Sequence, residues 1–378
     1  LSVVAVPLLF WNEGRAVKRA RTLAEGAGKV VSVQAAAVEP GRDGALVHVS
    51  GQATSDEVLR DPTFGIERQA LALEREVEMF QWVQKEERRQ RKKLGGGTET
   101  VTTYTYSTEW QSSPVDSASF EESSGHENPS FPFEGETWRA ADVRLGAYHL
   151  APELAGDLDH QTEVPVGEEQ LAGVVPELRE RLKAVNGGFY LAADNAAAAN
   201  GDASSPKVGD VRVRFRVVEP AEATIVAAQH GPRLEPYHAE AGGDIALVSY
   251  GAKSAEEMFS AARTANNKLT WLLRVGGFVL LFVGIRSLLA PLQVAADVVP
   301  LAGRLVGGGL TLAAFLIAAP VALVTVAIGW LFYRPLLGGA LIALAIGCVV
   351  WLWRRSRKPA FVPPPPVFVP PPPPAPAR

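Results

Sequence analysis

Hydrophobic and polar positions divide this chain into three zones. From about residue 12 to 268 they are mixed, from about 269 to 353 the chain is apolar with few charges, and beyond it proline dominates. Only the first zone has the pattern of a water-soluble domain. The pattern predicts a large polar domain, a cluster of transmembrane helices and a tail.

Within the apolar zone we expect three transmembrane helices, at 269–289, 310–333 and 336–353. Each approaches the roughly 20 residues that cross a bilayer core. Pro320 is expected to kink the second helix. Only Arg334 and Pro335 separate it from the third, so these two helices should form a tight hairpin.

Charged and aromatic side chains mark the expected membrane surfaces. Long basic side chains near helix ends reach the headgroups, and Trp and Tyr gather at both interfaces. Because the aromatic residues lie at predicted helix ends, this interpretation fits better than ordinary core packing. The predicted membrane-interface anchors are Arg274, Arg286, Trp330, Tyr333, Trp351, Trp353, Arg354 and Arg355.

Residues 290–309 are too polar and too rich in proline to cross a bilayer. Val294, Val298 and Leu301 follow helical spacing, and Asp297 lies opposite them. We expect an interfacial amphipathic segment on the membrane surface.

The chain begins with the apolar stretch LSVVAVPLLFW, residues 1–11. As a helix it would rise about 16 Å, roughly half a bilayer core. We expect the C-terminal end of a first transmembrane helix whose beginning precedes this numbering. A buried strand of the polar domain is the alternative, and the coding sequence upstream of Leu1 distinguishes the two.

Basic residues after the last span indicate the orientation. Arg354, Arg355, Arg357 and Lys358 place the C-terminus in the cytoplasm, because positive residues stay inside. Counting back through three spans puts residues 12–268 on the extracytoplasmic side. The basic residues from Arg15 to Arg21 oppose this orientation, but long domains translocate largely regardless of charge.

Residues 354–378 form a cytoplasmic basic and polyproline tail, which ends in FVPPPPVFVPPPPPAPAR. This composition predicts an extended polyproline helix without a packed core. Such a tail serves either as a spacer or as the docking site of a protein partner.

The polar domain is predicted to be α+β, rich in antiparallel strands. VRVRFRVV at 211–218 alternates with period two, and 223–229 could pair with it. KVVSVQAAAV and ALVHVSGQAT indicate another strand pair around a GRDG turn.

A longer hairpin is expected between residues 71 and 110. LALEREVEMFQWV and TVTTYTYSTEW alternate with period two on either side of a charged, glycine-rich loop. The competing interpretation is a helix over 67–92, since Leu73, Val77 and Phe80 also suit helical spacing.

Other stretches predict helices or loops. Residues 168–185 have helical spacing with Pro176 dividing them, and a helix from Ala255 should run into the first span. The Ser-, Glu- and Pro-rich stretch from Gln111 to Pro132 should be a long loop.

Composition excludes several classes of function. A net charge of −4 and a pI near 6.0 argue against a nucleic-acid partner. The single cysteine, Cys348, excludes an intrachain disulfide and a cysteine zinc site.

Catalytic and cofactor motifs are absent from the sequence. It has no H-E-x-x-H, P-loop, G-x-G-x-x-G after a strand, or G-x-S-x-G. Asp157, Asp159 and His160 form a small acidic cluster that exposed loop polarity explains better than a metal site. We therefore expect no catalytic residues, no metal and no cofactor.

Several local sequences, in their order, resemble one family. They are PLLFWNEGRAV, EVEMFQWVQ, TYTYSTEW, NPSFPF, GAYHL, VGDVRVRF, MFSAARTANNKLTWLLR and GWLFYRPL. Together they resemble the transmembrane protein 43 (LUMA) family over nearly the whole chain.

The resemblance implies four membrane spans and a large domain between the first and second. Animal members place this domain in the lumen of the endoplasmic reticulum and nuclear envelope, self-associate and bind lamins and other envelope proteins. The polyproline tail and the Ala-, Gly- and Pro-rich composition depart from those members and suggest a bacterial one, to which the lamin role does not carry over. The expected location is then a bacterial inner membrane with a periplasmic domain, or the endoplasmic reticulum or inner nuclear membrane if the protein is eukaryotic.

Three functions remain open. The first is a membrane-anchored scaffold that forms homo-oligomers, organises membrane lipids and binds partners. The second is a membrane-bound hydrolase, or an accessory subunit, with a dispersed site. The third is a channel or transporter, against which the lack of buried charge argues.

Overall fold

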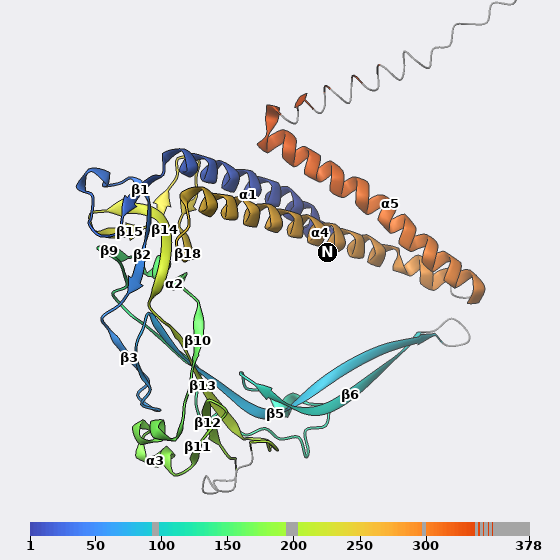
Figure 1. The fold of residues 1–378 in the computed structure, drawn as a ribbon. Helices are drawn as coiled ribbons and strands as arrows, with labels where there is room; N and C mark the ends of the chain where they lie inside the picture. Colours follow the sequence, from blue (N-terminus) through green and yellow to red (C-terminus); the bar gives the residue numbers. More distant parts are fainter. Residues whose placement is uncertain are drawn as a thin grey trace, which may run out of the picture.

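The protein is described by a computed structural model over residues 1–92, 98–193, 203–296 and 300–336, and at positions 339, 340, 343, 347 and 350. A long helix opens the chain, β-strands follow, and two long helices come after them (Figure 1). The architecture is therefore a β-rich α+β domain joined to a helical bundle, as predicted.

The three long helices pack together. Helix α1 (Ser2–Lys29) lies along α4 (Ala255–Ala296), and α5 (Pro300–Tyr333) packs against both. Helices α1 and α4 are antiparallel, because Ser2 lies beside Gly284 and Gly26 beside Phe259. Residues 2–11 are helical, so the alternative of a buried strand is wrong.

Among the residues that the structure describes, two helical segments are long and apolar enough to cross a bilayer, Ala255–Leu292 and Gly308–Tyr333. They contain the predicted spans 269–289 and 310–333, and the first also contains the helix predicted from Ala255. Most of the third predicted span, 336–353, lies outside the described residues. The same holds for Asp297 in the predicted interfacial segment.

One sheet, here called the proximal sheet, lies next to the helices. Its strands are β1 (Val31–Gln34), β2 (Leu46–Thr54), β8 (Arg144–Leu145), β9 (Tyr148–Leu150), β15 (Arg233–Glu235), β14 (Ala221–His230) and β18 (Leu247–Tyr250), in spatial order. Because β2 also pairs with β14, the strands from β2 to β14 close into a ring.

The second sheet, here called the distal sheet, lies farther from the helices (Figure 1). Its central path is β11 (Leu182–Val185), β12 (Gly188–Leu191), β13 (Val211–Val218), β5 (Ala72–Lys92) and β6 (Thr98–Gln111). Strand β10 (Gln161–Val164) pairs with β13, and β7 (Glu136–Arg139) pairs with β5.

Short elements complete the domain. They are the strand pairs β3 (Val58–Arg60) with β4 (Glu67–Gln69) and β16 (Tyr237–His238) with β17 (Asp244–Ile245), the α-helices α2 (Pro152–Gly156) and α3 (Pro176–Arg179), and the 3-10 turns η1 (Pro40–Arg42), η2 (Ser117–Ser119) and η3 (Glu168–Gly173).

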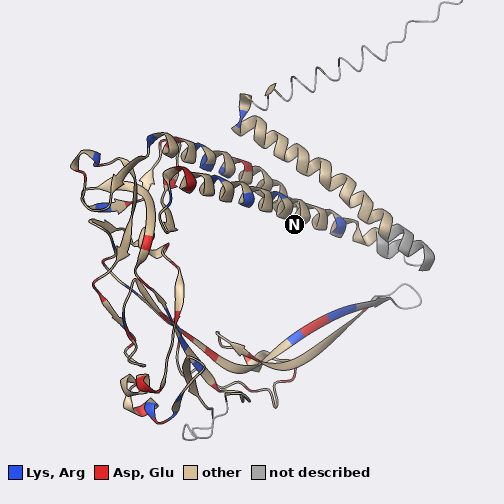
Figure 2. Cartoon of the chain, in the orientation of Figure 1, with Lys and Arg blue, Asp and Glu red and all other residues tan. Residues whose placement is uncertain are grey.

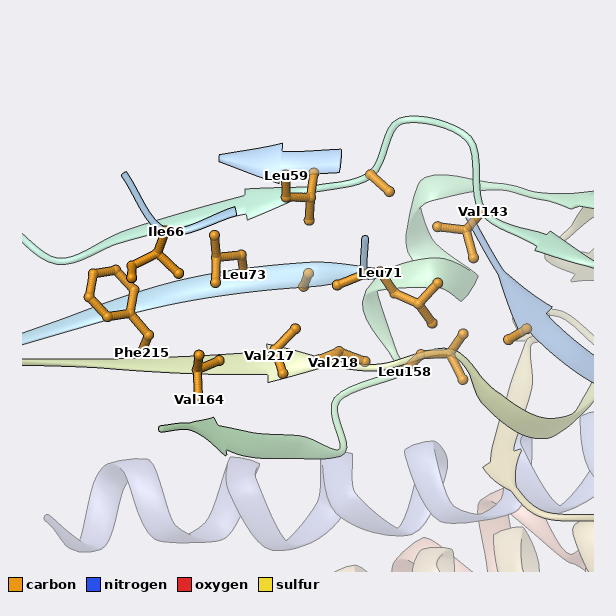
Figure 3. Close-up of a cluster of buried hydrophobic side chains, with 14 of the residues drawn as sticks. Leu59, Ile66, Leu71, Leu73, Val143, Leu158, Val164, Phe215, Val217 and Val218 are labelled. Atoms are coloured by element: carbon orange, nitrogen blue, oxygen red, sulfur yellow. The ribbon is translucent and has the colours of Figure 1, made fainter. Parts of the chain in front are cut away.

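Period-two patterning builds the distal sheet and its core. In β13 the apolar positions from Val211 to Val217 are buried, while the arginines between them are half-buried and two of them pair with Glu76 and Glu78 of β5. The buried side chains meet between the strands (Figure 3). This cluster includes Leu59, Ile66, Leu71, Leu73, Val143, Leu158, Val164, Phe215, Val217 and Val218.

The structure confirms the hairpin formed by β5 and β6, so the helix over 67–92 is wrong. The strand at 211–218 is confirmed, and so is the long loop after Gln111. Strand β14 does not pair with β13: after Glu219 and Pro220 the chain passes from the distal sheet to the proximal sheet. Strands β13 and β14 each bury apolar side chains in a different sheet. The local sequence pattern shows that each is a strand but not which sheet it joins.

Two other expectations are corrected. Strands β1 and β2 are neighbours but parallel, with Val31 opposite Val47, so the GRDG stretch does not close a hairpin between them. Within residues 168–185, two short helices, η3 and α3, form on either side of the break before Pro176 as expected, but residues 182–185 form strand β11 instead of continuing the second helix. The chain extends at Leu182 because pairing with β12 outweighs its helical spacing.

Candidate functional site: a polar junction between three helices

Polar residues of α1 are buried where the three long helices meet. Residues 12–15, Asn-Glu-Gly-Arg, directly follow the apolar start of the helix. Asn12 and Glu13 are 0% and 2% exposed. Burial of an amide and a carboxylate costs free energy unless partners satisfy them. Their hydrogen bonds therefore define the junction.

Glu13 joins all three helices. Its carboxylate accepts hydrogen bonds from Nε of Arg274 at 2.7 Å and from Nη2 at 2.8 Å, a two-point contact with α4. The indole N–H of Trp330 on α5 donates to the same carboxylate at 2.8 Å. The Arg274 guanidinium lies over the rings of Trp271 and Trp330. Such a charge-assisted, bidentate pair is both strong and directional.

Arg15 holds a second set of polar groups, all of them neutral. It donates to Asn266 at 3.0 Å, to Thr270 at 2.9 Å and to Asn12 at 3.2 Å. Asn12 and Asn266 in turn donate to backbone carbonyls of the opposite helix, at Thr270 and Ala16. These bonds fix the register of α1 against α4.

Glycines let the helices approach closely at the same level. A Cβ at Gly14 would lie 2.6 Å from the Tyr333 ring, and a Cβ at Gly329 would lie 2.9 Å from Glu13. Small residues of this kind allow close packing of membrane helices.

Aromatic side chains from all three helices gather around the junction. They are Trp11 of α1, Trp271 of α4, and Trp330 and Tyr333 of α5, with Phe10 packed against Tyr333 at 5.3 Å. Trp11 and Trp271 are 57% and 63% exposed. An aromatic girdle at one level is typical of a membrane–water interface.

The far end of the bundle has its own polar contact. Nε of Arg286 donates to Oγ1 of Thr311 at 3.2 Å, which joins α4 to α5. Between the two levels the helices expose large apolar side chains, among them Val275, Val279, Phe315 and Leu323. This arrangement suits a lipid environment on the outside of the bundle.

A pocket of about 400 Å³ opens beside the junction on the domain side. It is lined by Trp11, Gly14, Arg15, Val17, Lys18, Arg21, Ala241 and Tyr333. Arg21 donates to the Tyr333 backbone carbonyl at 2.8 Å, which places a cation at the C-terminal end of α5.

The C-terminal half of α1 is clamped to the loop between β16 and β17. The Glu25 carboxylate accepts from the backbone N–H groups of Ala241 and Glu240, and from Lys29 at 3.0 Å. The Ala241 N–H, and then the Lys29 ammonium, lower the pKa of Glu25 below its ordinary value. The junction ties the middle of α1 to α4 and α5, and the clamp ties its C-terminal half to the domain.

The predicted anchors fall into three sets. Arg274, Trp330 and Tyr333 come together at the junction, and Arg286 lies at the far end of the bundle. Trp351, Trp353, Arg354 and Arg355 lie outside the described residues. Sequence reasoning missed Asn12 and Glu13, although an acid and an amide directly after an apolar helix are a signal for buried pairing.

Asp157, Asp159 and His160, the small acidic cluster noted in the sequence, lie between α2 and β10. Asp157 caps α2, and the ring of His160 packs against Tyr250. The part of the chain that the structure describes contains no group of three or more potential metal ligands.

Comparisons with known proteins agree with this architecture. The family model described as Transmembrane protein 43 matches residues 79–335. Transmembrane protein 43 of Rattus norvegicus is 36% identical over 90% of this chain and 84% of its own length. The Homo sapiens protein is 35% identical over 93% and 87% of the two chains, and the Drosophila melanogaster homolog 31% over 92% and 90%.

No solved structure matches the chain. The names of this family and of these relatives do not denote an enzyme activity. With a family model that covers more than half of the chain and relatives above 30% identity over most of their length, the chain belongs to the transmembrane protein 43 family of membrane proteins.

Proposed function

We propose that this protein is a membrane-anchored scaffold that self-associates, binds partners through its large domain and organises the surrounding membrane. The observation that carries the proposal is the long ribbon formed by β5 and β6. The ribbon extends past the rest of the distal sheet, below the helices in Figure 1.

The ribbon has open backbone edges. Strands β5 and β6 stay paired from Met79–Gln111 to Lys92–Thr98. Strand β13 covers β5 only as far as Met79, and β7 only as far as Arg75. The backbone of Phe80 bonds to Gly209 and Asp210, and that of Trp82 bonds to the Asn128 side chain. Beyond Trp82 no third strand joins the ribbon within the described residues. An isolated two-stranded ribbon is marginally stable and offers edges for pairing.

The side chains of the ribbon suit a second copy of the same chain. Acidic and basic segments follow each other along it (Figure 2). Lys85 pairs with Glu109, and Arg89 pairs with Glu87 at 2.8 Å, while all four remain exposed or half-exposed. A surface with both signs of charge can complement a copy of itself in antiparallel contact.

The rigid attachment of the domain supports the same function. The junction around Glu13 and the clamp at Glu25 couple the domain to the membrane helices, so contacts between domains also position the helices. We place the domain on the extracytoplasmic side, in a bacterial inner membrane, with the polyproline tail in the cytoplasm.

The first test is the assembly state of the full chain in lipid nanodiscs, measured by mass photometry. We expect a defined oligomer. The second test uses a variant in which the dipeptide Asn-Gly replaces residues 87–103. Asn-Gly closes a two-residue turn between Glu86 and Tyr104, which lie directly opposite each other in the ribbon. This shortened ribbon should give smaller assemblies.

Removal of residues 359–378 is the matched control, because it shortens the chain at the tail and leaves the ribbon intact. It should leave the assembly unchanged. A monomer from the unaltered chain, or an unchanged oligomer with the shortened ribbon, would contradict self-association through this element.

A further inference from the structure

We propose that the pocket beside the junction binds the phosphate of an anionic phospholipid, whose acyl chains lie along the apolar part of α1. The pocket is built by α1, the end of α5 and the loop at Ala241. Its charge, its free donors and its place beside the aromatic girdle carry this inference.

The pocket is cationic. Its lining contains Arg15, Lys18 and Arg21 and, among the described residues, no carboxylate. Glu13 is the nearest acid along the helix, but its carboxylate is directed to Arg274 and Trp330 and is engaged there. The Glu13–Arg274 ion pair therefore lies outside the pocket, whereas Arg15, Lys18 and Arg21 line it.

Two of the three cations have donors left for a ligand. The Arg15 guanidinium already donates to Asn12, Asn266 and Thr270. It would therefore attract a phosphate mainly through its positive charge rather than through a hydrogen bond. Arg21 uses one nitrogen, Nη2, on the Tyr333 carbonyl. Lys18 is exposed, and its ammonium makes no hydrogen bond or ion pair with any residue that the structure describes. A phosphate would therefore bind to Lys18 and Arg21.

One stripe of α1 favours a lipid over a free phosphate. Lys18, Trp11 and Val4 follow each other at intervals of seven residues, and so lie on one face of the helix about 10 Å apart. Trp11 and Val4 are 57% and 62% exposed. A cation, an interfacial indole and an apolar side chain follow the order of phosphate, glycerol and acyl chain in a phospholipid.

The test measures lipid binding to the full chain in detergent micelles by native mass spectrometry. Dioleoyl phosphatidylglycerol and dioleoyl phosphatidylcholine are titrated separately. The unaltered protein should bind phosphatidylglycerol more tightly. Each basic residue near an anionic lipid contributes roughly fivefold, so Lys18→Gln with Arg21→Gln should weaken phosphatidylglycerol binding roughly 30-fold.

The matched control is Arg263→Gln with Lys268→Gln. Both residues are exposed on α4, on the domain side of Trp271, and their loss changes the net charge by the same amount. Phosphatidylglycerol binding should stay unchanged. All four substituted residues are exposed, and the thermal unfolding midpoint in the same detergent micelles without added lipid verifies that both variants are folded.

Three results would overturn the proposal. One is equal binding of the two lipids by the unaltered protein. Another is an equal loss in both double variants, which would assign the preference to diffuse charge. The third is displacement of phosphatidylglycerol by millimolar inorganic phosphate, which would make the pocket a general anion site.

Discussion

The carboxylate of Glu13 and the guanidinium of Arg274 form a two-point ion pair between the first and fourth helices, at 2.7 and 2.8 Å. Glu13 is 2% exposed and the Arg274 side chain 18%. The pair lies where the domain meets the membrane helices, so its integrity should govern how firmly the two are joined.

Glu13→Ala should destabilise the protein by about 3 kcal/mol, because it leaves the Arg274 charge without a partner. Thermal unfolding in detergent micelles, followed by near-ultraviolet circular dichroism of the tryptophans, measures the loss. The double variant Glu13→Gln with Arg274→Met should recover most of the stability, since both charges are then absent. Additive losses from the two positions would contradict a coupled pair.

Gly14→Ala should lower stability, whereas Gly28→Ala should not. A Cβ at Gly14 meets the Tyr333 ring at 2.6 Å, so the Tyr333 side chain or α5 must shift to accommodate it. A Cβ at Gly28, on the same helix, meets nothing within 4 Å, so alanine there should add up to about 1 kcal/mol through helix propensity. Unfolding midpoints in micelles compare the two, and equal effects would refute close packing of α1 and α5.

Asp61→Ala, in the turn between β3 and β4, should be among the most damaging single changes next to the distal sheet. Its carboxylate, 0% exposed, accepts from the Arg75 guanidinium at 2.8 Å and from the N–H groups of Thr63 and Phe64. Loss of one partner of a buried ion pair costs about 3–5 kcal/mol. Chemical denaturation in detergent micelles, followed by tryptophan fluorescence, measures this change.

The adjacent exposed pair is the control for Asp61. Arg60 and Glu67 lie 3.1 Å apart, and their side chains are 63% and 51% exposed. Arg60→Gln should cost less than about 1 kcal/mol. A comparable loss from Arg60→Gln would mean that burial does not set the cost at Asp61.

Acid should weaken the clamp between α1 and the loop that joins β16 to β17. The pKa of Glu25 is lowered, chiefly by the Ala241 N–H and then by Lys29. The carboxylate therefore contributes stability above its ordinary pKa of 4.5, and this contribution is lost as pH falls through the folded-state pKa. Unfolding midpoints measured from about pH 6 to pH 3 should fall with acid.

Glu25→Gln should make that pH dependence shallower. Glu240→Gln removes the other partner of Lys29 but keeps both backbone hydrogen bonds to Glu25, so its profile should stay close to that of the unaltered protein. Parallel profiles for the unaltered chain and Glu25→Gln would exclude Glu25 as the titrating group.

Local pattern alone was sufficient for the elements with strong periodicity. The alternation from Val211 to Val218 matches β13, because side chains on successive strand residues point to opposite faces. The hairpin of β5 and β6 followed from two alternating runs around a glycine-rich loop. The long apolar runs at 269–289 and 310–333 likewise match helices, since their length and composition are visible without any partner.

Pairing between distant segments could not be predicted in this way. Strands β13 and β14 are adjacent in the chain, yet they belong to different sheets, and β1 runs parallel to β2. The partner of a strand is chosen by the apolar surface that the whole domain buries, which depends on residues far apart in sequence.

The polar junction shows most clearly the difference between what local sequence pattern predicts and what tertiary packing decides. The sequence identified Arg274, Trp330 and Tyr333 as polar or aromatic residues near helix ends, but not their common partner. Glu13 is 261 residues from Arg274 and 317 from Trp330. Residue type and periodicity report on neighbours along the chain, whereas a buried carboxylate finds its donors only when antiparallel helix packing brings three distant segments to one level.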